Sequence, residues 1–265
     1  MHKKITQEHA QTMELTFPSY SILFVSGLLA GFVDAIAGGG GLIALPALLS
    51  VGLPPQLALG TNKFQGSFGT LSAAANFILK GKVKLSDNVV GIAFTLMGAT
   101  TGARAIQQIH ADFIKHLVPF MLLFVFFYTL MAKNLGVVQI KARMQKNIFF
   151  LLFGFGLGFY DGFFGPGTGA FWTGALLIFM GMDMTKATGT TRIMNFVSNI
   201  TALSLFIAGG NVLYTAGLIM AAGQIIGANI GSGMAIKRGA PFIRPIFLTM
   251  VFLTIVRLIY VNYIP

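Results

Sequence analysis

The sequence contains no cysteine and only seven acidic residues among 265. Without cysteine it forms no disulfide, no thiolate nucleophile and no sulfur-ligated metal site. The four histidines lie in the N-terminal tail and in one predicted loop, without the spacing of a zinc site (His2, His9, His110, His116). Charged residues of both signs make up 9% of the chain, against about 25% in soluble proteins. So little charge cannot cover a water-facing surface, and we expect most of the chain to face lipid.

Apolar residues, in contrast, make up 55% of the chain, and the mean hydropathy is +0.79. The net charge of +11 would favour nucleic-acid binding in a soluble protein. Here the lysines and arginines lie mostly in short segments between apolar stretches, which is typical of cytoplasmic loops in membrane proteins. No basic stripe alternates with stacking aromatic residues. We therefore expect a lipid bilayer, and no nucleic acid, as a partner.

An internal repeat divides the chain. Gly-Phe-Val-Asp at 31–34 returns as Gly-Phe-Tyr-Asp at 158–161, and each copy leads into a glycine-rich run. Gly-Thr-Asn-Lys at 60–63 is matched by Gly-Thr-Thr-Arg at 189–192, about 129 residues later. A duplicated half with helix-breaking glycines and isolated charges in apolar surroundings is typical of secondary transporters.

The apolar stretches are all predicted to be helices, because backbone polar groups need internal partners in lipid. The sequence therefore predicts an all-α, polytopic integral membrane protein. The stretches of the first half are Tyr20–Ala37, Leu42–Leu53, Ala58–Leu79, Val89–Ile109 and Leu117–Ala132, and those of the second half are Ile148–Phe164, Ala170–Met182, Thr188–Ala208, Val212–Ile236 and Pro245–Tyr260.

One of these regions is too long for a single crossing. A helix from Tyr20 to Leu53 would be about 50 Å long, whereas the hydrocarbon core is about 30 Å thick. The glycines Gly38–Gly41 are therefore expected to break it. Because Leu42–Leu53 alone is too short to cross, we predict a re-entrant helical hairpin. Each half then has three crossings plus one hairpin, and this odd number inverts the second repeat relative to the first.

The repeat predicts four segments along the chain: a polar N-terminal tail (1–19), a first transmembrane repeat (20–132), a basic cytoplasmic linker (133–147) and a second transmembrane repeat (148–265). Inversion places most loop lysines and arginines on one side, which the positive-inside rule makes cytoplasmic. Both termini are then outside. The sequence Ala-Ile-Ala at 35–37 resembles a signal-peptide cleavage site, but its motif recurs in mid-chain, so we expect no cleavage.

The glycine-rich breaks predict an anion site. Glycine exposes backbone N–H groups, and a half-helix that begins at such a break points its positive end into the bilayer, where it can hold an anion. Residues 39–44 also fit a dinucleotide-binding glycine pattern, but no strand–helix–strand unit surrounds them. Alternatively, the glycines serve only close helix packing. The candidate substrate-binding glycines are Gly38, Gly39, Gly40, Gly41, Gly165, Gly167 and Gly169.

Two cations occupy equivalent places in the repeat, Lys63 and Arg192. A cation within a membrane span costs about 2.5–3.5 kcal/mol and usually faces a cavity. Snorkelling to the membrane interface is the alternative. Polar neighbours strengthen the prediction of a pocket for a small oxyanion, and the candidates are Asn62, Gln65, Thr191, Asn195 and Asn199. Asn195 and Asn199 are four residues apart and so share one helix face.

Asp34 and Asp161 are the acids of the repeated motif. A carboxylate at this place would repel an anion unless it were paired or protonated. We expect the two acids to neutralise Lys63 and Arg192 in the empty carrier, or to carry a proton. The alternative is that each acid caps the end of a broken helix.

Three segments carry a resemblance to a known family. Residues 31–41, 60–65 and 158–169 read G-F-V-D-A-I-A-G-G-G-G, G-T-N-K-F-Q and G-F-Y-D-G-F-F-G-P-G-T-G. They resemble the sulfite exporter TauE/SafE family over Tyr20 to about Tyr260. The resemblance implies a multi-pass permease of the prokaryotic inner membrane that moves sulfite, sulfoacetate or related organosulfonates.

The predicted function is therefore a secondary transporter that works by alternating access around a midplane anion site. We expect no enzyme activity, no cofactor and no metal. An anion channel and a non-transporting membrane assembly protein are the alternatives. The anion itself, the direction of transport, a proton or other coupling ion, and a homodimer are all left open by the sequence.

Overall fold

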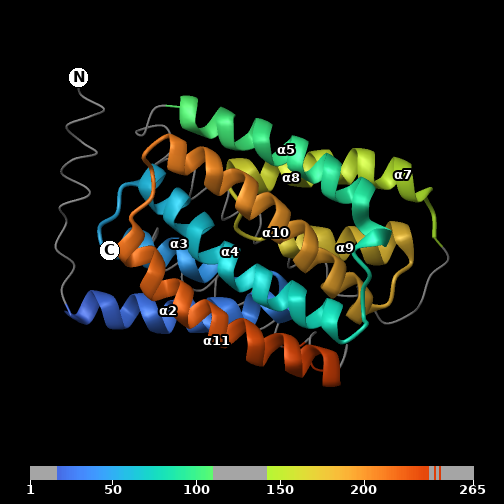
Figure 1. Cartoon of the computed structure of the whole chain (residues 1–265), viewed down its shortest axis with the longest axis horizontal. Coiled ribbons are helices and arrows are strands. Elements are labelled where there is room, and N and C mark those ends of the chain that lie inside the picture. The colour runs from blue at the N-terminus through green and yellow to red at the C-terminus, as the bar shows by residue number, and fades with distance from the viewer. Residues whose placement is uncertain (1–16, 110–141, 239–241, 243–244, 246–265) are drawn as a thin grey trace, which may run out of the picture.

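The computed structural model describes residues 17–109 and 142–238, together with Phe242 and Pro245. The described part consists of helices and their connections, without a strand, which confirms the all-α prediction (Figure 1). In chain order the helices are α2 (Phe17–Ala37), α3 (Gly41–Ser50), α4 (Pro55–Leu79), η1 (Ser86–Asn88), α5 (Val89–Gln108), α7 (Lys146–Phe149), η2 (Phe150–Gly154), α8 (Phe155–Phe163), α9 (Thr168–Met180), α10 (Met184–Ala208) and α11 (Tyr214–Arg238).

Four segments of the described part are long and apolar enough to cross a membrane: α2, Ser86–Gln108, α10 and α11. Helix α4 has 25 residues and is therefore about 37 Å long, but its polar residues lower its hydropathy. A bundle of such helices is a polytopic membrane protein, as the composition predicts. The N-terminal residues 1–16, the stretch Leu117–Ala132, linker residues 133–141 and most of Pro245–Tyr260 lie outside the described residues.

The structure contains both predicted helix breaks. Helix α2 ends at Ala37 and α3 begins at Gly41, and α8 ends at Phe163 with α9 beginning at Thr168. The half-helices α3 and α9 have 10 and 13 residues, so they are about 15 and 20 Å long and cannot cross a core of about 30 Å. Figure 1 shows α3 turning back beside α2, and α9 turning back beside α8. The breaks therefore form helical hairpins.

The helical stretch that leads into the second hairpin contains a π-helical turn. The segment predicted at Ile148–Phe164 is helical up to Phe163 and consists of α7, one π-helical turn η2 and α8. The turn occurs where the ring of Phe150 fits against Gly91 of α5, leaving no room for a side chain at that glycine. Such π-turns widen a helix locally to accommodate a side chain.

Helices from different halves pack closely through glycine. Gly227 of α11 lies against the backbone of Leu28 in α2, and Gly98 of α5 lies against the backbone of Phe155 in α8. These contacts are equivalent under the repeat, because α2 corresponds to α8 and α5 to α11. A side chain at either glycine would overlap the facing helix, as in close helix pairs of membrane proteins. The helix that leads into each hairpin, α2 or α8, therefore packs against a helix of the other half, α11 or α5.

Equivalent helices of the two halves run in opposite directions through the molecule (Figure 1). In Figure 1, α4 and α10 cross the molecule in opposite directions, and so do α5 and α11. This is the arrangement that inverted repeats would produce. The two-fold superposition of the halves, and the division of the chain into repeats at 20–132 and 148–265, stay predictions.

The charged loops gather at one end of the bundle, which we call the basic end. There α4, α9 and α11 end and α7 and α10 begin. The cations at or beside these helix ends are Lys80, Lys82, Lys84, Arg143, Lys146, Lys186, Lys237 and Arg238. In the part of the chain that the structure describes, Arg104, near the end of α5, is the only cation close to the opposite end.

Candidate functional site

The tips of the two hairpins meet in the middle of the molecule. A Cβ atom built on Gly38 would lie 2.5 Å from the carbonyl carbon of Gly169, and one built on Gly41 would lie 3.0 Å from Cα of Pro166. Gly38 has φ of +82°, and Gly167 has φ of +83°, a left-handed conformation that favours glycine. The glycines thus allow two bare backbones to touch where the half-helices α3 and α9 begin.

Two ion pairs lie beside these tips, and both join the two halves. Lys63 Nζ of α4 lies 2.6 Å from Asp161 Oδ1 of α8, and Arg192 Nη1 of α10 lies 2.9 Å from Asp34 Oδ2 of α2. The exposed side-chain fractions are 2% and 4% in the first pair and 0% and 15% in the second. Each cation is therefore neutralised by the acid of the opposite repeat.

The Lys63–Asp161 pair is surrounded by further hydrogen bonds. Lys63 Nζ also donates to Oδ1 of Asn199 over 3.1 Å, and the hydroxyl of Ser198 donates to Asp161 Oδ2. Both carboxylate oxygens of Asp161 thus have a partner from another helix. A buried ion pair needs such extra bonds to offset the cost of removing its charges from water.

Asp34 has a different environment. Its Oδ1 accepts the backbone N–H of Gly40 over 3.3 Å, which satisfies one N–H group at the start of α3. Arg192 also donates to the backbone carbonyl of Asp34. Pairing with a cation and capping a broken helix, the two alternatives for this acid, therefore occur together at Asp34.

Arg192 is fully buried and only partly satisfied. Its Nη2 lies 2.8 Å from the positions that a Cβ atom would take at Gly38 and at Gly169. Among the described residues, Nη2 and Nε have no hydrogen-bond partner. A buried donor without a partner costs about 1–3 kcal/mol, and more when it is charged. An oxyanion or ordered water beside the helix tips would remove this cost.

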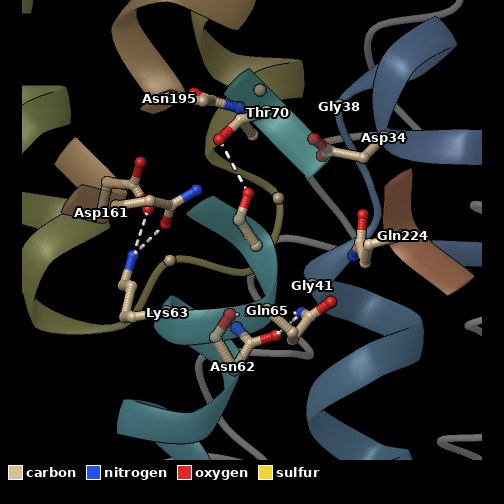
Figure 2. Close-up of a pocket in the computed structure, with 15 residues that line it drawn as sticks. Asp34, Gly38, Gly41, Asn62, Lys63, Gln65, Thr70, Asp161, Asn195 and Gln224 are labelled. Carbon is tan, nitrogen blue, oxygen red and sulfur yellow. Dashed lines mark hydrogen bonds and ion pairs between the residues drawn. The ribbon is translucent and has the colours of Figure 1, made fainter. Parts of the chain in front are cut away.

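A small cavity lies beside the tips and has a volume of about 30 Å³. Since one water needs about 10–15 Å³ of such space, the cavity holds only a few atoms. Figure 2 shows Lys63 and Asp161 on one side, Asp34 and Gln224 on the other, and Thr70 between them. The lining residues are Asp34, Gly38, Gly41, Asn62, Lys63, Gln65, Gly66, Thr70, Asp161, Gly165, Gly167, Gly169, Asn195, Asn199 and Gln224.

Most of the candidate residues line this cavity, but four do not: Gly39, Gly40, Thr191 and Arg192. Gly40 packs against α2, where its Cβ would lie 2.6 Å from the carbonyl oxygen of Ala30. The hydroxyl of Thr191 pairs with that of Thr173 at 3.1 Å. Arg192 does not line the cavity itself, but its ion-pair partner Asp34 does.

Three lining residues were not among the candidates. Gly66 and Thr70 occupy the positions of Asn195 and Asn199 in the other repeat, so the repeat itself could have identified them. Gln224 of α11 offered no such signal, because its position in the first repeat is Thr95. It enters the site because Gly31 and Gly69 leave room for its amide.

These features define the class of protein: a polytopic membrane transport protein whose broken helices meet at a buried, charge-paired site. The chain belongs to the sulfite exporter TauE/SafE family, whose model matches residues 23–258. It is 41% identical over 248 residues to a probable membrane transporter protein of Haemophilus influenzae, with 94% of this chain and 97% of the relative covered. It is 39% identical over 239 residues to the probable membrane transporter protein YfcA of Escherichia coli, with 90% and 89% covered.

More distant relatives carry similar names. The sulfite exporter TauE/SafE family protein 5 of Arabidopsis thaliana is 29% identical over 103 residues, which cover 39% of this chain and 22% of the relative. No solved structure matches the chain. The family match confirms the resemblance carried by the repeated motif, and the names of the relatives are those of transporters, not enzymes.

Proposed function

We propose that this protein is a secondary transporter that moves small sulfur oxyanions, such as sulfite, sulfoacetate or another organosulfonate, by alternating access. The observation that carries the proposal is the crossed pairing of Lys63 with Asp161 and of Arg192 with Asp34 beside a small cavity. Buried charges within membrane helices usually mark the path of a substrate or an ion. Because each pair joins the two halves, a change in either pair alters how the halves hold each other.

The charges of the site explain how an anion can compete for it. Two cations and two acids sum to zero, so the empty site is neutral. An anion that takes the place of one carboxylate beside a cation meets the unpartnered donors of Arg192, and the site stays neutral when the displaced carboxylate takes up a proton. Amide groups of Asn62, Asn195 and Gln224 line the same cavity and can donate to the remaining anion oxygens.

The cavity size favours a compact substrate. A volume of about 30 Å³ suits a few atoms, such as a sulfite ion or the sulfonate head of a larger molecule. The preference for sulfur over other oxyanions rests on the family to which the chain belongs. The starts of two half-helices, α3 and α9, add partial positive charge on the substrate side.

Asp34 is the proposed coupling group. Its side chain lines the cavity and is more exposed than that of Asp161. Its charged partner is Arg192, and the Gly40 N–H and Gln224 lie beside it. Lys63 and Asp161 face the same cavity from the other side. Protonation of Asp34 would give the site one positive charge and release Arg192 for an anion. Substrate and proton would then move together.

We place the protein in the inner membrane of a prokaryotic cell, with the basic end in the cytoplasm and both termini outside. The support is the collection of cations at one end of the bundle, since cytoplasmic loops carry an excess of lysine and arginine. The oligomeric state, including a homodimer, stays an open question.

The test is counterflow in proteoliposomes. External radiolabelled sulfite should enter faster when unlabelled sulfite is trapped inside, because a carrier returns more rapidly when it is loaded. An anion channel would show no such acceleration, and an assembly protein would show no uptake above empty vesicles. Sulfite, sulfoacetate, isethionate, taurine and sulfate, compared by thermal stabilisation of the purified protein, would order the substrates.

A further inference from the structure

Two loops at opposite ends of the bundle have the same backbone conformation. The connection after α4 (residues 80–84) and the connection after α10 (residues 209–213) are equivalent in the repeat. Each contains a glycine with left-handed φ, Gly81 at +66° and Gly210 at +68°. In both loops the N–H of the residue after this glycine donates to a carbonyl of the preceding helix over 2.9 Å.

The second of these loops closes the end opposite to the basic end. The N–H of Leu213 donates to Oγ1 of Thr61 in α4 over 2.9 Å. Leu213 is buried together with Leu53 and Leu57, with exposed fractions of 6%, 3% and 5%, in one apolar cluster. We call these four residues the leucine seam. It seals α4 against the start of α11.

The equivalent place at the basic end is open and charged. The three leucines of the seam are replaced there by Lys84, Lys186 and Met182 in the repeat, and Thr61 is replaced by Thr190. These residues line a cavity of about 330 Å³. Among the described residues no hydrogen bond joins the Lys84 N–H to Thr190, although the equivalent bond closes the leucine seam.

The charges in this cavity favour an anion. Lys84, Lys146 and Lys186 line it, against Asp87 and Asp183, so the side chains sum to one positive charge. The carboxylate of Asp183 already accepts the backbone N–H of Lys186 over 2.9 Å at the start of α10. None of the three lysines forms an ion pair with either acid in the described part of the chain. Their ammonium groups are available to a ligand.

We propose that this cavity is a second binding site, an access site at which the transported oxyanion binds before or after the central cavity. The proposal rests on the transport function proposed above. Thr190 of the access site and Asn195 of the central cavity are five residues apart on α10, about 7.5 Å along its axis. A cleft lined by cations raises the local concentration of anions. The leucine seam is its closed, apolar counterpart.

The absence of cysteine allows a direct test. In the Met182→Cys variant, which places a single thiol at a half-buried position of the cavity lining, modification by an anionic sulfonatoethyl methanethiosulfonate should be about tenfold faster than by its cationic trimethylammonium analogue, after correction for free cysteine. Adding Lys84→Leu and Lys186→Leu, the residues of the seam, should remove this preference. Lys82→Asn, which changes an exposed lysine of the same loop to its repeat equivalent, should keep it. Leu53→Cys, the equivalent position in the closed seam, should react with neither reagent.

Equal rates for the two reagents at Met182→Cys, or no reaction there, would overturn the access site. Transport gives a second measurement with its own outcome. In sealed vesicles, Lys84→Leu with Lys186→Leu should raise the KM for sulfite presented at the basic end about tenfold and leave the KM from the other end unchanged. Lys84→Gln with Lys186→Gln should act in the same direction without adding apolar bulk. An unchanged KM, or equal increases from both ends, would contradict the proposal. If wild-type vesicles move no oxyanion, the transport proposal fails by that result alone, while the labelling preference still decides whether the cavity binds anions.

Discussion

Lys63 forms its ion pair with Asp161, which belongs to the other half of the repeat, with 2.6 Å between Nζ and Oδ1. The acid equivalent to Asp161 in the half that contains Lys63 is Asp34, and Asp34 pairs instead with Arg192. The exchange is reciprocal, so the two halves are held together by both pairs at the helix breaks. Any movement of one half against the other must accommodate these contacts.

The first prediction concerns the energy of this pairing. Asp161→Asn leaves Lys63 as an unpaired buried cation, which should destabilise the protein by about 3–5 kcal/mol. Lys63→Gln should do the same to Asp161. The double variant should be more stable than the sum of the two single losses indicates, because no charge is left unpaired. Melting temperatures of the four proteins in detergent test this, and additive losses would show that the pair has no energetic coupling.

The second prediction separates two neighbouring glycines. Gly38→Ala must adopt a left-handed φ, and its methyl group would displace Arg192 and the backbone of Gly169. Transport per folded molecule should fall to background. Gly39→Ala is the matched control, because its methyl group meets only side chains at 3.7 and 3.8 Å and lies outside the cavity lining. It should keep nearly full activity, and equal effects of the two substitutions would argue against a special role for the helix tip.

The third prediction tests coupling through Asp34. If a proton on this carboxylate admits the anion, the affinity for isethionate should rise as pH falls, because protonation adds one positive charge to a neutral site. Isethionate suits the test because its sulfonate stays ionised over the range. Asp34→Asn, which cannot be ionised, should bind isethionate with little dependence on pH. Asp161→Asn, on the opposite side of the cavity, should retain the dependence. A wild-type affinity that does not change with pH would exclude Asp34 as the proton carrier.

The helix breaks and the cavity residues could be predicted because their signals are local. Four consecutive glycines or a lone lysine in an apolar run are visible without knowledge of the fold, and the repeat tells which positions correspond. Lys63, Asn62 and Asn199 were found in this way, and they line the cavity. The signal fails where the fold brings in a partner without a repeated motif, as it does for Gln224.

The pairing of the charges could be predicted only in part. The sequence indicates that two acids and two cations lie at similar depth, and a carboxylate there needs a partner. It does not say which acid meets which cation, because that depends on how α8 lies beside α4 and α2 beside α10 in the folded protein. The role of Gly40 depends on packing in the same way, since its N–H bonds to Asp34 and its missing side chain lets α3 approach α2.

The central claim is that the buried cations bind a small oxyanion, and calorimetric titration of the purified protein with sulfite tests it most directly. Wild-type protein should bind sulfite saturably, and Lys63→Ala and Arg192→Ala should each lower the affinity of the central site at least tenfold, equivalent to about 1.4 kcal/mol. Arg104→Ala, an exposed cation at the end opposite to the basic end, should bind like the wild type. Unchanged affinity in both Lys63→Ala and Arg192→Ala, with the proteins folded, would contradict the account and place the anion site elsewhere.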